Sequence, residues 1–66
     1  MRSMYDVQQL LKRYGIFVYI GNRSWDIEVM MSELRDLRLA NVIEEQEFIS
    51  AMMILKREYR IETQEG

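Results

Sequence analysis

Cysteine, histidine and proline are all absent from this 66-residue chain, and glycine occurs only three times. Without cysteine the chain has no disulfides or thiolate metal ligands, and without histidine it lacks the commonest general base and neutral metal ligand. Without proline, nothing in the sequence interrupts a long helix. A chain this short must pack its apolar residues efficiently to fold alone. We therefore expect one domain over residues 1–66 with no metal and no cofactor.

The polar residues that remain have structural explanations. The glycines are too widely spaced for a phosphate-binding loop, and the serines have no histidine to activate them. The acidic residues Glu44, Glu45 and Glu47 fall where a helix is expected to begin, and helix N-termini favour negative charge. We therefore expect no catalytic residues, and a binding protein rather than an enzyme.

Apolar residues recur at helical spacing in three segments, which predicts an all-α, compact three-helix bundle. The first helix is predicted over residues 4–14, with Ser3 at its N-terminus and Gly15 as a left-handed stop. The second is predicted over residues 24–40 and the third over residues 44–60. The predicted core positions are Met4, Val7, Leu10, Leu11, Tyr14, Ile27, Met30, Met31, Leu34, Leu37, Phe48, Ala51, Met52, Leu55 and Tyr59.

Residues 15–23 join the first two predicted helices and contain a strand-like run, Ile16 to Ile20. The sequence offers no second run of this kind to pair with it, and an unpaired strand leaves backbone groups unsatisfied. We expect an extended, apolar linker that packs its side chains on the open side of the helical core. Two alternatives remain open. The run could pair between two copies in a homodimer, or it could extend the first helix.

Hydrophobic residues make up 48% of the chain, a share typical of a folded domain rather than a disordered one. The run Ile16 to Ile20 is far too short to cross a bilayer, and the first six residues lack the apolar core of a signal peptide. We therefore expect a cytoplasmic protein with no membrane contact.

Basic residues fall mostly in the last turns of the predicted helices, where they complement the helix dipole. If the helices run up, down and up, the ends of the first and third helices share one basic end of the bundle. Aromatic rings would flank these cations, a combination that suits single-stranded nucleic acid, although the net charge is −2. The candidate nucleic-acid-binding residues are Lys12, Arg13, Arg23, Lys56, Arg57, Arg60, Tyr19 and Trp25.

This prediction depends on the path of the linker. Nine extended residues reach roughly 30 Å, enough to return along the bundle and start the second helix at its other end. Arg23 and Trp25 would then leave the basic end. The ring of Trp25 lies away from the apolar stripe of its helix, so it either packs on the linker or faces outward.

An alternative function follows from the third predicted helix, which is apolar around much of its circumference. Ile49 and Met53 form a second strip beside the core positions, and Ile54 lies outside both strips. Methionine adapts to varied partners, and a broad apolar face favours a second binding partner. The alternative is therefore a helical protein–protein interaction module or a homodimerising structural protein.

Four stretches carry a resemblance to a known family: residues 4–15 (MYDVQQLLKRYG), 19–23 (YIGNR), 26–30 (DIEVM) and 47–58 (EFISAMMILKRE). They resemble the YqgQ-like family of small, largely uncharacterised proteins of Gram-positive bacteria. The resemblance implies a compact three-helix fold in the cytoplasm and single-stranded nucleic acid binding, with no catalytic residues. The family's turn Tyr-Thr-Gly-Asp-Arg reads Tyr-Ile-Gly-Asn-Arg here, which removes a negative charge beside Arg23. We expect that loss to leave Arg23 freer to meet a phosphate.

Overall fold

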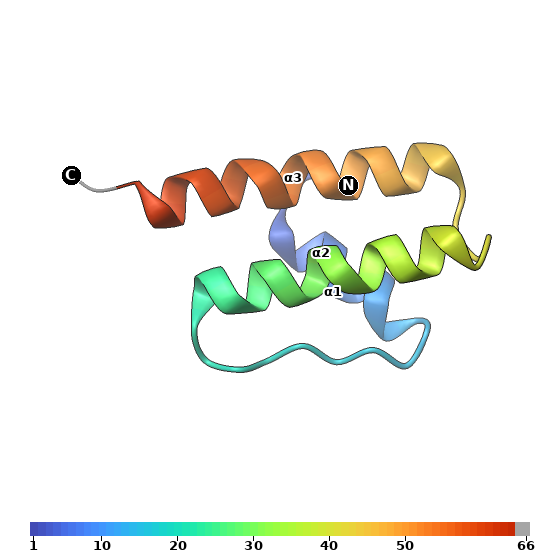
Figure 1. Ribbon diagram of the computed structural model, residues 1–66, viewed down its shortest axis with the longest axis horizontal. Helices are drawn as coiled ribbons and strands as arrows, with labels where there is room; N and C mark the ends of the chain where they lie inside the picture. The colour runs from blue at the N-terminus through green and yellow to red at the C-terminus, as the bar shows by residue number, and fades with distance from the viewer. Residues whose placement is uncertain (65–66) are drawn as a thin grey trace.

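The computed structural model describes residues 1–64 and contains three helices, α1 (Met4–Lys12), α2 (Arg23–Leu39) and α3 (Glu45–Thr63) (Figure 1). The predicted all-α three-helix fold is confirmed. Positions 65 and 66, which the predicted domain included, lie outside the described residues. None of these three helices is both long and apolar enough to cross a membrane.

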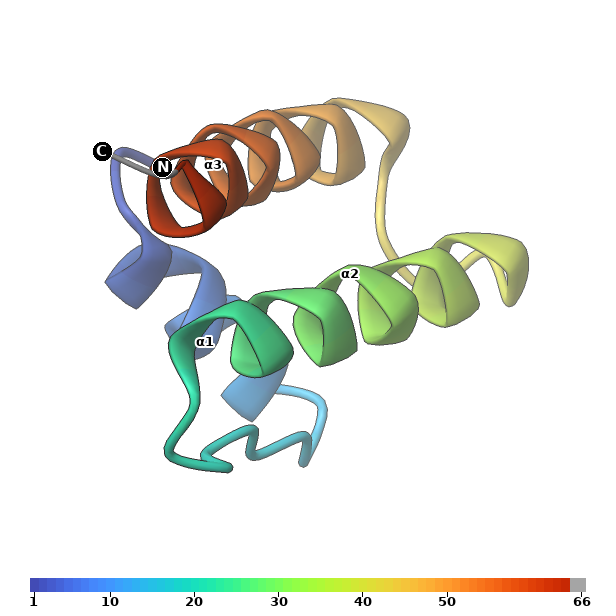
Figure 2. The same cartoon turned by 60° about the vertical axis from the view of Figure 1, so that its left-hand side comes forward.

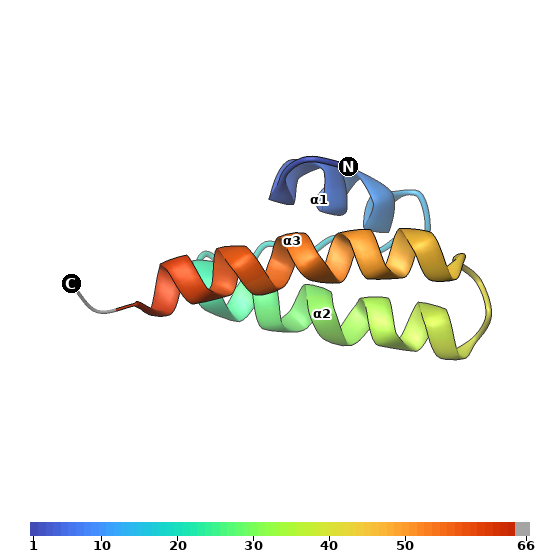
Figure 3. The same ribbon diagram turned by 90° about the horizontal axis from the view of Figure 1, so that it is seen from above.

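The prediction from sequence assumed that the three helices alternate in direction, but they do not. α2 and α3 form an antiparallel pair, and α1 packs across one side of that pair (Figures 1 and 3). The linker leaves the end of α1 and runs back along the bundle to the start of α2 (Figure 2), so α1 and α2 run in the same general direction. The up-down-up arrangement is therefore wrong, because nine extended residues are long enough to return along the bundle.

Gly15 turns the chain away from α1, as the sequence predicted. Gly15 adopts a φ of 77°, in the left-handed region that glycine enters without a steric penalty. The N–H of Ile16 then donates to the carbonyl of Leu11 at 3.1 Å, the backbone bond that closes a Schellman motif. The regular helix ends at Lys12, before the predicted boundary, so Tyr14 follows α1 instead of belonging to it.

Two asparagines set the ends of α2. The side chain of Asn22 accepts a hydrogen bond from the backbone N–H of Trp25 at 3.1 Å and so caps the helix. At the other end Asn41 adopts a φ of 59°, and the following residue donates its N–H to the carbonyl of Leu37 at 2.9 Å. α3 continues to Thr63, further than its apolar periodicity predicted.

The core is built from side chains of all three helices, mostly at the predicted positions. Three residues differ. Ile43, in the connection between α2 and α3, was not among the predicted core positions but is only 3% exposed. Ile54 was predicted to lie outside the core but is only 8% exposed, because the N-terminal segment and α1 pack over this side of α3. Tyr14 was predicted inside but is 39% exposed. The buried apolar residues are Val7, Leu10, Leu11, Ile27, Met30, Leu34, Ile43, Ala51, Met52, Ile54 and Leu55.

The linker alternates between core-facing and exposed side chains. Ile16 and Val18 pack against the core, whereas Phe17 and Tyr19 are 72% and 89% exposed. This period of two is typical of an extended chain. The expected extended, core-packing linker is therefore confirmed for Ile16 and Val18, and the alternative of a longer first helix is wrong.

A buried carboxylate anchors the far end of the linker. Asp26, in the first turn of α2, is only 6% exposed and accepts a hydrogen bond from the backbone N–H of Ile20 at 2.7 Å. This bond fixes the place where the chain turns from the linker into α2.

Candidate nucleic-acid interface

The predicted basic end of the bundle does not form. Near the start of α3, Nη2 of Arg13 lies 3.3 Å from Oε2 of Glu47. Near the end of α3, Nη2 of Arg23 lies 2.9 Å from Oε1 of Glu58, and its Nε lies 3.4 Å from Oε2 of Glu62. The two contacts on α3 are about 16 Å apart along the helix axis, because a helix rises about 1.5 Å per residue. Arg13 and Arg23 therefore lie near opposite ends of α3.

Arg23 is not freed by the asparagine before it. Its guanidinium contacts two carboxylates of α3, and its side chain is 50% exposed. Exposed ion pairs contribute little to stability, but they do offset the charge that a phosphate would meet. The expectation of a freer Arg23 is therefore wrong, because the third helix supplies the negative charge that the turn has lost.

A different basic cluster lies between the N-terminal segment and α3. Lys56, Arg57 and Arg60 project from the last turns of α3, and Arg2 approaches them from the segment before α1. With Met1, Ser50, Met53 and Ile54 they line an open depression of about 670 Å³. Within residues 1–64, none of the four cations forms an ion pair, and the lining contains no carboxylate. We call the surface of Arg2, Lys56, Arg57 and Arg60 the basic groove.

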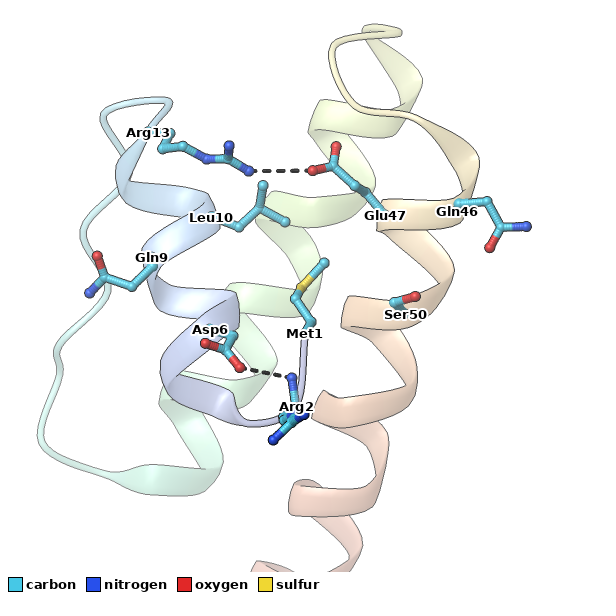
Figure 4. A pocket seen from close by; sticks show the side chains of 9 residues that line it. All are labelled: Met1, Arg2, Asp6, Gln9, Leu10, Arg13, Gln46, Glu47 and Ser50. Atoms are coloured by element: carbon cyan, nitrogen blue, oxygen red, sulfur yellow. Dashed lines mark hydrogen bonds and ion pairs between the residues drawn. The ribbon is translucent and has the colours of Figure 1, made fainter.

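A second depression lies on the other side of the N-terminal segment, between α1 and α3 (Figure 4). It has a volume of about 780 Å³, and here the charges are paired. Arg13 and Glu47 meet across it, and the carboxylate of Asp6 accepts the backbone N–H of Arg2 at 2.7 Å. Because basic and acidic groups balance, this depression is less suited to an anion than the basic groove.

Asp6 holds the segment that carries Arg2. Its carboxylate accepts hydrogen bonds from the backbone N–H groups of Arg2 and Ser3, at 2.7 and 3.2 Å. These bonds favour the ionised form and lower the pKa of Asp6 below its usual 3.8. Asp6 therefore stays ionised near neutral pH and ties the segment to the first turn of α1.

The predicted stacking rings are exposed but lie apart from the basic groove. Trp25 faces outward and is 61% exposed, and Tyr19 is the most exposed ring in the described chain. Tyr19 lines a depression of about 260 Å³ between α1 and the linker, together with Phe17 and Lys12. That depression shares no lining residue with the basic groove. Tyr19 therefore lies beside the predicted cation Lys12, but neither predicted ring lines the basic groove.

The apolar surface behind the alternative function is smaller than predicted, because Ile54 belongs to the core. Ile49 and Met53 remain 43% and 67% exposed. Both line a depression of about 310 Å³ beside Arg35 and Lys56.

Arg2 is the groove residue that sequence reasoning missed. It precedes the first helix, so no helical periodicity assigns it to a face. Its partners Arg57 and Arg60 lie more than 50 positions later in the chain. Their proximity depends on how α1 crosses α3, which local patterns do not determine.

The fold and the groove define a small all-α protein in which four cations that form no ion pair within residues 1–64 line one surface. The chain belongs to the YqgQ-like family, whose model matches residues 1–61. It is similar to YqgQ of Bacillus subtilis (strain 168), with 43% identity over 58 residues that cover 88% of this chain and 82% of that protein. The family resemblance of the sequence is therefore confirmed. The relative's name assigns it no activity, so the function is argued from the geometry.

Proposed function

We propose that this protein is a non-enzymatic, cytoplasmic protein that binds single-stranded nucleic acid weakly and without strong sequence preference. One observation carries the proposal: four cations converge on the basic groove, and no carboxylate of residues 1–64 lines it. One guanidinium group can donate two parallel hydrogen bonds to a phosphate. Phosphate contacts supply most of the affinity in sequence-independent binding.

The composition of the groove favours a ligand that is both anionic and apolar. Met53 is 67% exposed beside the cations, and Met1 borders the same surface. Arg57 and Arg60 are about 4.5 Å apart along α3, so the two can contact neighbouring phosphates. A flexible single strand can follow an open groove of this size while its bases contact the apolar side chains.

The proposal divides the predicted binding residues into main and secondary contacts. In this proposal Lys56, Arg57 and Arg60 are phosphate contacts, as predicted from the sequence, and Arg2 is added because it lines the same groove. Arg13 and Arg23 already contact carboxylates, and Lys12 lies beside the linker, so these three are secondary contacts in the proposal. Tyr19 and Trp25 are the proposed stacking sites for bases outside the groove, where an exposed ring contributes about 1–3 kcal/mol per base.

The test is fluorescence anisotropy of labelled single-stranded and duplex oligonucleotides at several salt concentrations. Four phosphate contacts predict a slope of log affinity against log salt of about −3 for a single strand. The triple variant R2A/R57A/R60A should reduce the slope to about −1. The variant R35A/R38E is the matched control, because it also lowers the net charge by three units, at positions outside the groove and outside the secondary contacts. It should bind nearly as well as the original protein.

Two results would overturn this proposal. The first is absence of single-strand binding at low salt, which would leave a protein partner at Ile49 and Met53 as the better hypothesis. The second is equal loss of affinity in R2A/R57A/R60A and R35A/R38E, since that would mean that total charge, not the groove, governs binding. A W25A variant reports separately on stacking, because it leaves the groove intact.

A further inference from the structure

The outer edge of the linker carries backbone groups without partners. The N–H of Ile16 donates to a carbonyl of α1 at 3.1 Å, and that of Ile20 donates to Asp26 at 2.7 Å. In an extended chain, successive N–H groups point to opposite sides, so those of Phe17 and Tyr19 point to the side opposite those of Ile16 and Ile20. Within residues 1–64 they have no hydrogen-bond partner. This side of the linker therefore carries unpaired backbone donors within residues 1–64.

This edge has none of the features that usually prevent strand pairing. Proteins protect exposed edges with lysine, proline, bulges or a covering element. Here residues 14–22 contain no charged side chain, and the chain contains no proline. Phe17, Tyr19 and Ile20 are 72%, 89% and 53% exposed. The edge therefore presents both unpaired backbone groups and uncovered apolar area.

We propose that this edge binds a second copy of the chain, with residues 16–20 pairing antiparallel about Val18. The run Ile-Phe-Val-Tyr-Ile alternates aliphatic and aromatic residues symmetrically about its centre. In this register Phe17 lies opposite the second copy's Tyr19, and each such pair exchanges both of its backbone hydrogen bonds. The outward aromatic rings meet across the strands, where aromatic pairs are favourable.

The symmetry of the run favours a second copy over an unrelated strand. With a twofold axis through Val18, the same residues of each copy pair their backbone hydrogen-bonding groups, as an isologous interface requires. Residues 14–22 themselves carry no charge, and the cation in the depression beside Phe17 and Tyr19 is Lys12 of α1. Each aromatic side chain covers about 150–250 Å², so the paired strands and their rings bury on the order of 1,000 Å². That area lies at the low end for specific interfaces, and the dimer is therefore weak.

The interface leaves the basic groove free. Its residues lie on the linker, whereas the groove lies between the N-terminal segment and α3. The dimer therefore carries two grooves on one particle. It does not depend on nucleic acid binding, so the two proposals fail or succeed separately.

Charge substitution at the two exposed ring positions tests the pairing and its register. The double variant F17K/Y19K places lysine opposite lysine in both cross-strand pairs, whereas F17K/Y19E places lysine opposite glutamate. Tyr5→Lys is the control, because Tyr5 is 64% exposed on α1, outside the linker. Sedimentation equilibrium would cover protein concentrations on the order of 10 µM to 1 mM, the range that suits a small interface. Helical circular dichroism confirms that each variant is folded.

The original protein and Tyr5→Lys should both approach twice the monomer mass at high concentration. F17K/Y19K should associate about tenfold or more weakly, and F17K/Y19E should recover part of the loss. A protein that stays monomeric throughout overturns the proposal, as does F17K/Y19K that associates like the original. If F17K/Y19E associates no better than F17K/Y19K, the antiparallel register about Val18 is wrong.

Discussion

Replacing Asp26 with alanine removes the carboxylate that ties the linker to α2. Asp26 is buried, and its oxygen lies 2.7 Å from the backbone nitrogen of Ile20. A hydrogen bond to a charged group contributes about 1.5–3 kcal/mol, and a domain of this size has a free energy of unfolding of about 3–10 kcal/mol. We expect Asp26→Ala to lose a large share of that stability and to lower Tm by about 6–24 °C.

Urea unfolding, followed by helical circular dichroism and by Trp25 fluorescence, measures this loss. Trp25 is the single tryptophan and immediately precedes Asp26. Asp36→Ala is the matched control, because it removes an exposed carboxylate from the same helix and should change stability by less than about 0.5 kcal/mol. Asp26→Asn keeps an acceptor oxygen and should lose less than Asp26→Ala.

A double-mutant cycle identifies the hydrogen bond as the source of the effect. Ile20→Pro removes the N–H donor, so Asp26→Ala should cost less in that background than in the original protein. Hydrogen exchange of the Ile20 amide should also accelerate in Asp26→Ala. The reasoning is refuted if Asp26→Ala matches Asp36→Ala in stability, or if its cost is the same with and without the Ile20 donor.

Two further predictions concern the ends of α1. Backbone hydrogen bonds lower the pKa of Asp6, so the ionised side chain stabilises the fold relative to Asp6→Asn. This difference in the free energy of unfolding is complete at pH values well above 3.8, and it disappears as the pH falls through the pKa of Asp6 in the folded protein. Urea unfolding at several pH values should show the two proteins converging in acid, and parallel curves would contradict this. Gly15→Ala places a side chain at a φ of 77° with open space around it, and should cost about 1 kcal/mol of backbone strain. Gly15→Asn should lose less stability than Gly15→Ala, because asparagine tolerates this φ better. Equal losses of the two variants in thermal unfolding would contradict backbone strain as the cause.

The helices and most of the core could be predicted from sequence because they depend on short-range patterns. Apolar residues three and four positions apart face the same side of a helix wherever that helix lies. Val7, Ile27, Met30 and Leu55 follow this pattern and are fully buried. Gly15 and Asn41 also act locally, since each adopts the left-handed conformation that ends a helix.

The candidate site could not be predicted in the same way. Sequence reasoning grouped Arg13 and Arg23 at one end of the bundle, but each contacts a different end of α3. It missed Arg2, which gains basic neighbours only through the crossing of α1 and α3. Burial of Ile54 has the same origin, because this side of α3 looks unpartnered until the N-terminal segment covers it.

The sequence by itself determined three helices, their apolar faces, their stop signals and an uncharged extended linker. Only the tertiary structure decided the direction of that linker, and with it the set of charges that meet. The physical reason is that periodicity acts within one helix, whereas helix order in space depends on contacts between distant residues. Here the bond from Ile20 to Asp26 and the packing of Ile16 and Val18 hold the linker in its returning path.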